Sequence, residues 1–143
     1  MLKLCKVSSS DTDFSIVKDI RQSVFVMEQG VDPKMEHDGF ESSCQHYLLK
    51  SAMDNIGVTR IRKTEFGLKL ERFAILKEHR SKGYGKSLVE FVLADLKSVN
   101  VYLHAQIQVV GFYERLGFEV QGDQFLEAGI KHFKMVFKAE QSN

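Results

Sequence analysis

The sequence is short of the residues that mark several special classes of protein. Its 143 residues include no tryptophan, one proline and two cysteines. Cys5 and Cys44 lie far apart, without a CxxC spacing or a neighbouring histidine cluster. The sequence therefore indicates neither a disulfide framework nor a structural zinc site, and we expect no metal and a reducing environment.

An excess of charge of one sign is also lacking. Twenty lysines and arginines stand against 19 aspartates and glutamates, which leaves a formal net charge of +1. Without an overall field, neither nucleic acid nor an anionic membrane is an expected partner, and any anion site must be local. No run approaches the ~20 apolar residues that span a bilayer, and residues 1–6 lack the apolar core of a secretory signal. We expect a cytoplasmic protein.

Length and composition fit one ordinary globular domain. A chain of 143 residues can bury one good core but is too short for two typical domains. Hydrophobic residues at 43% and charged residues at 27% are near the averages for soluble proteins, which argues against disorder. We expect a single domain over residues 1–138, followed by a solvated C-terminal tail over residues 139–143.

The first half of the sequence predicts a strand, a helix, a loop and a meander of strands. A strand around Cys5 precedes capping residues at 10–13, after which apolar residues recur at helical spacing from Phe14 to Gly30. The next segment contains the only proline and mixed charge, which is typical of a surface loop over residues 31–43. Three antiparallel strands are then expected at residues 47–49, 56–62 and 68–76.

The second half predicts a crossover and two closing strands. A helix follows Gly85, because apolar residues from Leu88 to Leu96 mark one helical face. The remaining elements are a buried strand, a short helix closed by Gly117, and two more strands, at residues 101–105, 109–116, 118–120 and 133–137. The order βαβββαβαββ predicts an α/β (α+β) fold with a mixed, mostly antiparallel central sheet flanked by about four helices.

The turn Arg80–Gly85, between a predicted strand and a predicted helix, has the features of an anion site. A helix N-terminus carries unpaired N–H groups and a partial positive charge, and glycine lets the backbone approach an anion closely. Arg80, Lys82 and Lys86 add cations enough for a diphosphate. The turn matches neither Walker A nor the dinucleotide fingerprint GxGxxG, and a plain connector with solvated basic residues is the alternative.

This turn, read as RxxGxG, resembles the acetyl-CoA signature of the GNAT acetyltransferase superfamily. Residues 112–118, FYERLGF, are similar to the fourth helix of that superfamily. Further segments resemble its ElaA/YjcF-like branch, at residues 24–29, 36–38, 70–72, 105–106 and 128–132. The resemblance covers nearly the whole chain. His37 and Lys131 depart from the branch, on the side where the acceptor is expected.

The resemblance implies a GNAT-like fold, acetyl-CoA as the cofactor and direct attack by the acceptor amine, without an acyl-enzyme. It also implies that the pantetheine arm pairs with the backbone of residues 73–75, where an N–H group polarises the thioester carbonyl. The residues expected at the cofactor are Phe73, Ala74, Ile75, Arg80, Ser81, Lys82, Gly83, Tyr84, Gly85, Lys86, Gln106 and Phe112.

Tyr113 is the expected general acid. A phenol can return a proton to the departing thiolate, and the resemblance places this tyrosine at the cofactor. The alternative is a core residue, because Val109, Phe112 and Leu116 share its helix and aromatic residues at this spacing usually pack.

The acceptor ammonium must also lose a proton, and Glu71 is the first candidate for the general base. Strand alternation predicts that Glu71 shares a face with Phe73 and Ile75 and points away from Arg72. His132 is the second candidate. Glu28, Asp38 and His104 are further possibilities, although each alone is more often structural.

The expected acceptor is a primary amine on a small molecule, and an amino sugar phosphate is one form of it. Arg62 or Arg72 would then be the anion partner, and Glu28 and Asp38 complete the expected substrate-binding residues. A protein lysine or N-terminal acetyltransferase stays open as an alternative, and so does a non-catalytic acyl-CoA sensor. Whether the chain is a monomer or a homodimer is also left open.

Overall fold

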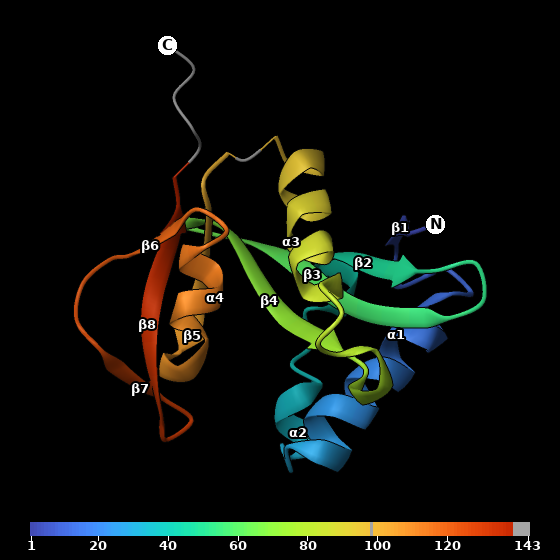
Figure 1. Cartoon of the computed structure of the whole chain (residues 1–143). Coiled ribbons are helices and arrows are strands. Elements are labelled where there is room, and N and C mark those ends of the chain that lie inside the picture. Colours follow the sequence, from blue (N-terminus) through green and yellow to red (C-terminus); the bar gives the residue numbers. More distant parts are fainter. Residues whose placement is uncertain (98, 139–143) are drawn as a thin grey trace.

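The computed structural model describes residues 1–97 and 99–138, and its centre is one mixed sheet. The strand order is β1-β2-β3-β4-β5-β8-β6, with β7 also paired to β8 (Figure 1). Only β4 and β5 pair in parallel among the described strands. The strands are β1 (Lys3–Val7), β2 (Gln45–Lys50), β3 (Asn55–Thr64), β4 (Gly67–Ile75), β5 (Val101–Gln106), β6 (Phe118–Val120), β7 (Phe125–Glu127) and β8 (Ile130–Phe137).

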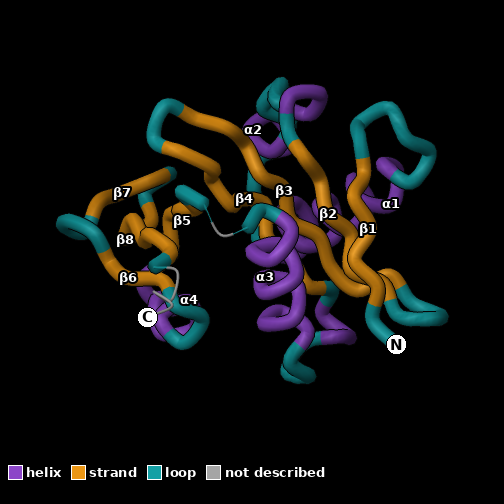
Figure 2. The backbone as a smooth tube through the Cα atoms, turned by 90° about the horizontal axis from the view of Figure 1, so that it is seen from above, coloured by secondary structure: helices purple, strands orange, loops and turns teal. Residues whose placement is uncertain are grey.

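Helices cover both faces of the sheet. Figure 2 shows α1 (Phe14–Arg21) and α2 (Pro33–Glu36) on one side of β1 to β4 and α3 (Tyr84–Asp95) on the other. The fourth helix, α4 (Val110–Glu114), packs against β5 and β6. No helix among the described residues is long and apolar enough to cross a membrane.

The predicted fold class is confirmed, with three local differences. The first helix becomes a π-helix over Gln22–Glu28, and the predicted loop over residues 31–43 contains α2 and a 3₁₀ turn at Glu41–Ser43. Strand β7 was not predicted, because its three residues are ordered by a hairpin at Ala128 and Gly129, both with positive φ. The predicted tail, residues 139–143, lies outside the described residues.

Two hydrophobic clusters divide the core by sheet face. Residues of α1 pack with Leu48, Val58 and Ala74 of the strands. Residues of α3 pack with Tyr47 and Leu49 on the opposite face. Neighbouring positions of β2 thus face different helices, as strand geometry requires.

Strand β4 breaks this alternation at Arg72. Its register with β3 shifts between Val58 and Arg60, and Arg72 has a φ of 52°. Leu70 packs in the α3 cluster whereas Ala74 packs in the α1 cluster, although an even separation would put both on one face.

The predicted side-chain directions on β4 are therefore wrong. Phe73 and Ile75 do belong to the α3 cluster. Glu71 lies on the other face, where it and Arg72 enter the same group of ion pairs instead of pointing apart. One extra residue in a bulge reverses the face of every residue after it, which a strict period of two cannot anticipate.

The bulge lies where β4 and β5 separate. The two strands pair only at Leu68 with Val101 and at Lys69 with Tyr102. From Leu70 to Ile75, the edge of β4 that faces β5 has no strand partner, and the two strands diverge toward the start of α3 (Figure 1). An extended ligand can pair with such an unpaired edge.

Candidate active site

The turn Arg80–Gly85 forms a nest of backbone N–H groups at the start of α3. Ser81 and Gly83 have left-handed φ angles of 63° and 82°, and Gly83 is the N-cap of the 12-residue helix. A Cβ added at Gly83 would meet no atom of the protein within 4 Å, so the space in front of the turn is open. These features suit a diphosphate, which the free N–H groups and the helix dipole would hold.

The cations of the turn are not equivalent. Lys82 and Lys86 are exposed and have no ion-pair partner among the described residues. Arg80 instead donates from Nη1 and Nη2 to Glu28 at 2.9 and 2.8 Å, and from Nε to the Ile75 carbonyl at 2.9 Å. Glu28, a predicted substrate residue, therefore lies beside the turn Arg80–Gly85, at the end of the π-helix.

An aromatic wall connects the turn to the opening between β4 and β5. The rings of Phe73 and Phe112 lie 6.2 Å apart, and Phe112 contacts Tyr113 with 5.0 Å between ring centroids. A Cβ added at Gly85 would come within 3.4 Å of both phenylalanine rings. Glycine at this position thus lets the first turn of α3 approach the wall closely.

Tyr113 is almost completely buried against this wall, at 7% exposure, with Phe73 and Phe118 on either side. No described residue hydrogen-bonds its hydroxyl. Burial raises the pKa of Tyr113 above its usual value, so the phenol stays protonated at neutral pH and has a proton to donate. Both sequence interpretations, core residue and general acid, are compatible with this placement.

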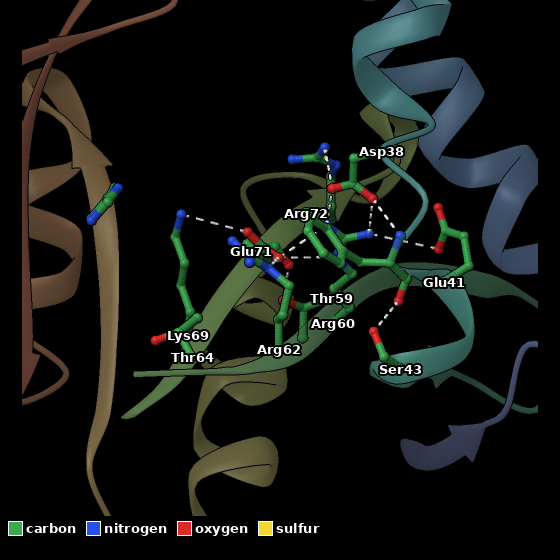
Figure 3. Close-up of polar contacts among 12 residues, drawn as sticks. Asp38, Glu41, Ser43, Thr59, Arg60, Arg62, Thr64, Lys69, Glu71 and Arg72 are labelled. Atoms are coloured by element: carbon green, nitrogen blue, oxygen red, sulfur yellow. Dashed lines mark hydrogen bonds and ion pairs between the residues drawn. The ribbon is translucent and has the colours of Figure 1, made fainter. Parts of the chain in front are cut away.

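On the opposite face of β4, arginines and carboxylates form a dense ion-pair network (Figure 3). Its members are Arg21, Glu36, Asp38, Glu41, Arg60, Arg62, Glu71 and Arg72. Arg60, 1% exposed, contacts both Asp38 and Glu71. Arg72 donates to Asp38 at 3.1 Å. The network ties the segment around α2 to the bulge of β4.

One carboxylate oxygen of Glu71 accepts the hydrogen bonds that hold this residue in the network. Its Oε1 accepts hydrogen bonds from Arg62 at 2.7 Å and from Arg60 at 2.9 Å, and Lys69 approaches Oε2 to 3.6 Å. Burial opposes ionisation, but the hydrogen bond from Arg62 and the charges of Arg60 and Lys69 lower the pKa of the Glu71 carboxyl overall. A carboxylate stabilised in this way is a weak proton acceptor.

A second cluster lies on β5, β7 and β8, where Glu127 contacts two histidines. His104 Nδ1 lies 3.0 Å from one carboxylate oxygen of Glu127, and His132 Nε2 lies 3.5 Å from the other. His132 Nδ1 is 2.7 Å from the Ile130 carbonyl and must donate to it. The hydrogen bond from His104 lowers the pKa of Glu127.

The remaining predicted substrate residues are placed by the same ion pairs. Asp38, Arg62 and Arg72 come together on one face of β3 and β4, but the two arginines already pair with carboxylates of the network. Gln106, at the end of β5, accepts from the Gln108 side chain at 2.6 Å.

Sequence reasoning missed the residues whose role depends on distant partners. Arg21 and Arg60 are 1% exposed and Glu36 is 3% exposed, yet each looks like an ordinary charged residue in the sequence. Glu127 was missed together with strand β7. The one available signal was Arg60 between the apolar residues Val58 and Ile61 of a predicted strand, because a buried charge requires a partner.

Comparison with known proteins gives a consistent result. Residues 17–139 match the family model described as an acetyltransferase (GNAT) domain. An uncharacterized N-acetyltransferase, YjcF of Bacillus subtilis (strain 168), is 36% identical over 121 residues, which cover 82% of this chain and 86% of YjcF.

Solved structures agree with the sequence match. Escherichia coli ElaA has a TM-score of 0.83 at 23% identity, covering 96% of this chain and 100% of ElaA. A Bacillus subtilis acetyltransferase in complex with CoA has a TM-score of 0.63 at 18% identity, covering 95% of both chains. At these identities the structural likeness concerns the fold.

The network makes a prediction about acid stability through Asp38. Burial opposes ionisation of Asp38, but hydrogen bonds from Arg60 and the Phe40 amide and the charge of Arg72 lower its pKa to about 2, from an ordinary 3.8. The ionised carboxylate therefore contributes stability above its ordinary pKa, and this contribution is lost as the pH falls through about 2. Asp38→Asn should show a smaller decrease in the free energy of unfolding over this range, measured by urea denaturation.

Asp123→Asn is the matched control, because Asp123 is exposed and has no ion pair among the described residues. It should follow the wild-type pH dependence. If Asp38→Asn also kept the wild-type slope, the ion pairs of Asp38 would contribute nothing to acid stability.

Proposed function

Because the chain belongs to the GNAT acetyltransferase family and is an acyltransferase, we propose that it transfers an acetyl group from acetyl-CoA to a primary amine of a small molecule. The main structural support is the opening between β4 and β5, which leads from the phosphate-binding turn at α3 to the bulge at Arg72. A nest, an unpaired strand edge and an aromatic wall then follow one another along a single path.

The residues along this path fit the parts of acetyl-CoA, which supplies the acetyl thioester. The N–H groups at Gly83–Gly85 and the ammonium groups of Lys82 and Lys86 would hold the diphosphate. The edge of β4 beyond Lys69 offers backbone groups to the two amides of the pantetheine arm. Arg80 would join the phosphate site only by exchanging its two hydrogen bonds to Glu28.

Transfer proceeds by direct attack in this proposal. A backbone N–H of β4 near Phe73 polarises the thioester carbonyl, and Tyr113 donates its phenolic proton to the departing sulfur. Neither cysteine is suited to carry an acyl group. Cys5 lies in the edge strand β1, and burial raises the pKa of the Cys44 thiol, which disfavours the nucleophilic thiolate.

For the proton of the acceptor ammonium, the geometry favours His104 over the two residues ranked first from the sequence. Glu71 is held ionised by its cations. His132 donates from Nδ1 to Ile130, and its Nε2 faces the Glu127 carboxylate at 3.5 Å, so both ring nitrogens are directed to groups of the protein. His104 gives its Nδ1 proton to Glu127, so its Nε2 is left as the acceptor.

The two alternative functions differ from this proposal in what they require. An acyl-CoA sensor needs only the cofactor path and does not need a proton acceptor beside it. A protein acetyltransferase needs a surface that accepts an extended peptide at the bulge, where the α2 segment is instead fixed by buried ion pairs. The donor–acceptor arrangement around the opening therefore favours a small-molecule transferase.

Gly83→Ala should weaken acetyl-CoA binding without a matching loss of fold. Saturating ligand at a hundred times its dissociation constant stabilises a protein by about 2.7 kcal/mol, and a Cβ at Gly83 would project into the open space before the turn. Thermal unfolding with and without acetyl-CoA should show a ligand shift in the wild type and little shift in the variant.

Gly122→Ala is the control for backbone strain. Gly122 also has a positive φ, 84°, and no atom within 4 Å of an added Cβ, but it lies between β6 and β7. Both variants should lose about 1 kcal/mol of stability through the left-handed alanine. Only Gly122→Ala should keep the ligand shift. Equal ligand shifts in the two variants would show that the turn Arg80–Gly85 only connects β4 to α3 and does not bind the cofactor.

Tyr113→Phe should lower the rate of the chemical step by roughly 10²- to 10⁴-fold, the usual range for general acid catalysis. Stability should change little, because the hydroxyl has no hydrogen-bond partner among the described residues and the ring stays packed. Single-turnover rates with an amine that the wild type acetylates make the comparison, since product release can mask the chemical step. Rates close to wild type would leave Tyr113 as a core residue.

His104→Gln should reduce kcat/KM by about 10²-fold or more. His132→Gln is the matched comparison, because both histidines contact Glu127. It should keep a kcat/KM close to that of the wild type, and acetyl-CoA affinity should be unchanged in both variants. The reverse result would assign the base to His132, and a kcat/KM close to wild type in both variants would return the role to Glu71 or to water.

A further inference from the structure

A groove of about 540 Å³ lies over β3, β4, β5 and β8, next to the point where β4 and β5 separate. Its volume is in the range of sites for small molecules. The residues that line it are Arg62, Thr64, Glu65, Phe66, Lys69, Tyr102, His104 and Lys134. Since His104 forms one wall, the groove reaches the proton acceptor of the proposed transfer.

The aromatic surfaces of the groove are already covered by cations of the protein. Lys134 Nζ lies 5.1 Å from the centre of the Phe66 ring and 5.3 Å from that of Tyr102. Arg62 lies over the ring of Phe40, at 4.6 Å, on the same side of β3. On the Phe66 and Tyr102 rings, Lys134 thus already makes the cation–π contact that the ammonium group of a ligand would make.

The charges of the lining leave one cation uncompensated. Arg62 and Lys69 both contact Glu71, as Figure 3 shows. Lys134 has no carboxylate within ion-pair distance among the described residues, although its side chain is half-buried. The only carboxylate in the lining is Glu65, which is exposed in the β3–β4 hairpin. An anionic group in the groove would complete the electrostatics that the protein leaves open.

Lys134 and His104 are direct neighbours across β5 and β8. Side chains opposite each other on paired strands lie about 5 Å apart at Cβ, so one small molecule can reach both. The hydroxyls of Thr64 and Tyr102 lie in the same lining and hydrogen-bond each other at 2.7 Å. One of them donates to the other, which leaves one hydroxyl proton of the pair for an anion.

We propose that this groove is the acceptor site and that it takes an amine which also carries an anionic group, phosphate or carboxylate. Lys134 binds the anion, and the amine lies at His104, directed to the opening between β4 and β5. The proposal rests on the proposed acetyl transfer and adds the class of acceptor. It replaces Arg62 and Arg72, which are neutralised by the network, as partners of the anion.

The same charges disfavour a purely cationic acceptor. A polyamine brings two or more ammonium groups into a lining that already holds three cations, Arg62, Lys69 and Lys134, against one exposed carboxylate. Repulsion in a half-buried groove is less screened than at an open surface. Selection among amines therefore depends on their negative group.

Acceptor pairs that differ in one charged group test the proposal. Thiol release from acetyl-CoA is measured with ethanolamine against O-phosphoethanolamine, with cadaverine against lysine, and with spermidine. We expect the anionic member of at least one pair to have a kcat/KM at least tenfold above its partner, and spermidine to be poor. The two pairs separate phosphate from carboxylate. Equal or better turnover of the amines that lack an anionic group would overturn the proposal.

Lys134→Ala should then reduce kcat/KM for the anionic acceptor by about tenfold or more, mainly through KM. The kcat/KM for the matching amine without the anionic group should stay unchanged. Lys63→Ala is the matched control, because Lys63 is an exposed lysine of β3 between Arg62 and Thr64 but does not line the groove. It should behave as wild type. Equal losses for both acceptors, or equal effects of the two variants, would contradict a role of Lys134 in binding the anion.

A binding measurement keeps the groove separate from the transfer reaction. Calorimetric titration of O-phosphoethanolamine and of lysine into the CoA-saturated protein should show binding that Lys134→Ala weakens, even if no amine is acetylated. No binding of either compound together with no turnover of any anionic amine would reject the groove assignment. Failure of CoA itself to bind would instead reject the proposed function.

Discussion

The burial of Arg60 is the constraint on which the rest of the site depends. A guanidinium at 1% exposure is tolerated only when carboxylates surround it, and here Asp38 and Glu71 do so. Asp38 comes from the segment after α2 and Glu71 from β4. The buried charge of Arg60 therefore holds the segment after α2 against the centre of the sheet. Arg21 acts in the same way from α1, through Glu36 and Glu41.

The bulge at Arg72 lets one strand serve two different surfaces. Before it, Leu70 faces the α3 core, and after it Phe73 does, while Glu71 and Arg72 both turn to the ion-pair network. Phe73 and the unpaired edge of β4 can then form the cofactor path on one side, while charged side chains organise the other side. If β4 had kept its alternation, Phe73 and Glu71 would lie on the same face of the sheet. The cofactor path and the ion-pair network could then not lie on opposite faces of this strand.

Whether a charged residue near the opening can bind a ligand depends on its ion pairs and not on its residue type. Near the opening, Arg62 pairs with Glu71, and Arg72 pairs with Glu36 and Asp38. Lys134 and His104 instead keep groups that a ligand can use. Buried ion pairs of this kind add little net stability but cost much when one partner is lost. Their main effect here is to hold strands and the α2 segment in one arrangement around the groove.

The sequence by itself determined most of the helices and strands, the fold class and the turn at Arg80–Gly85, because hydrophobic period, glycine position and helix-start signals act over a few neighbouring residues. It also placed Phe73, Phe112 and Tyr113 together through a family resemblance that the GNAT match confirms. Only the tertiary structure decided which charges remain available. The partners of Glu71 and Arg72 come from segments up to 37 residues away. Strand β7 forms only by pairing with β8, and the bulge arises from the register between β3 and β4. Charge pairing depends on distances that the chain acquires after folding, and therefore no local pattern could predict it.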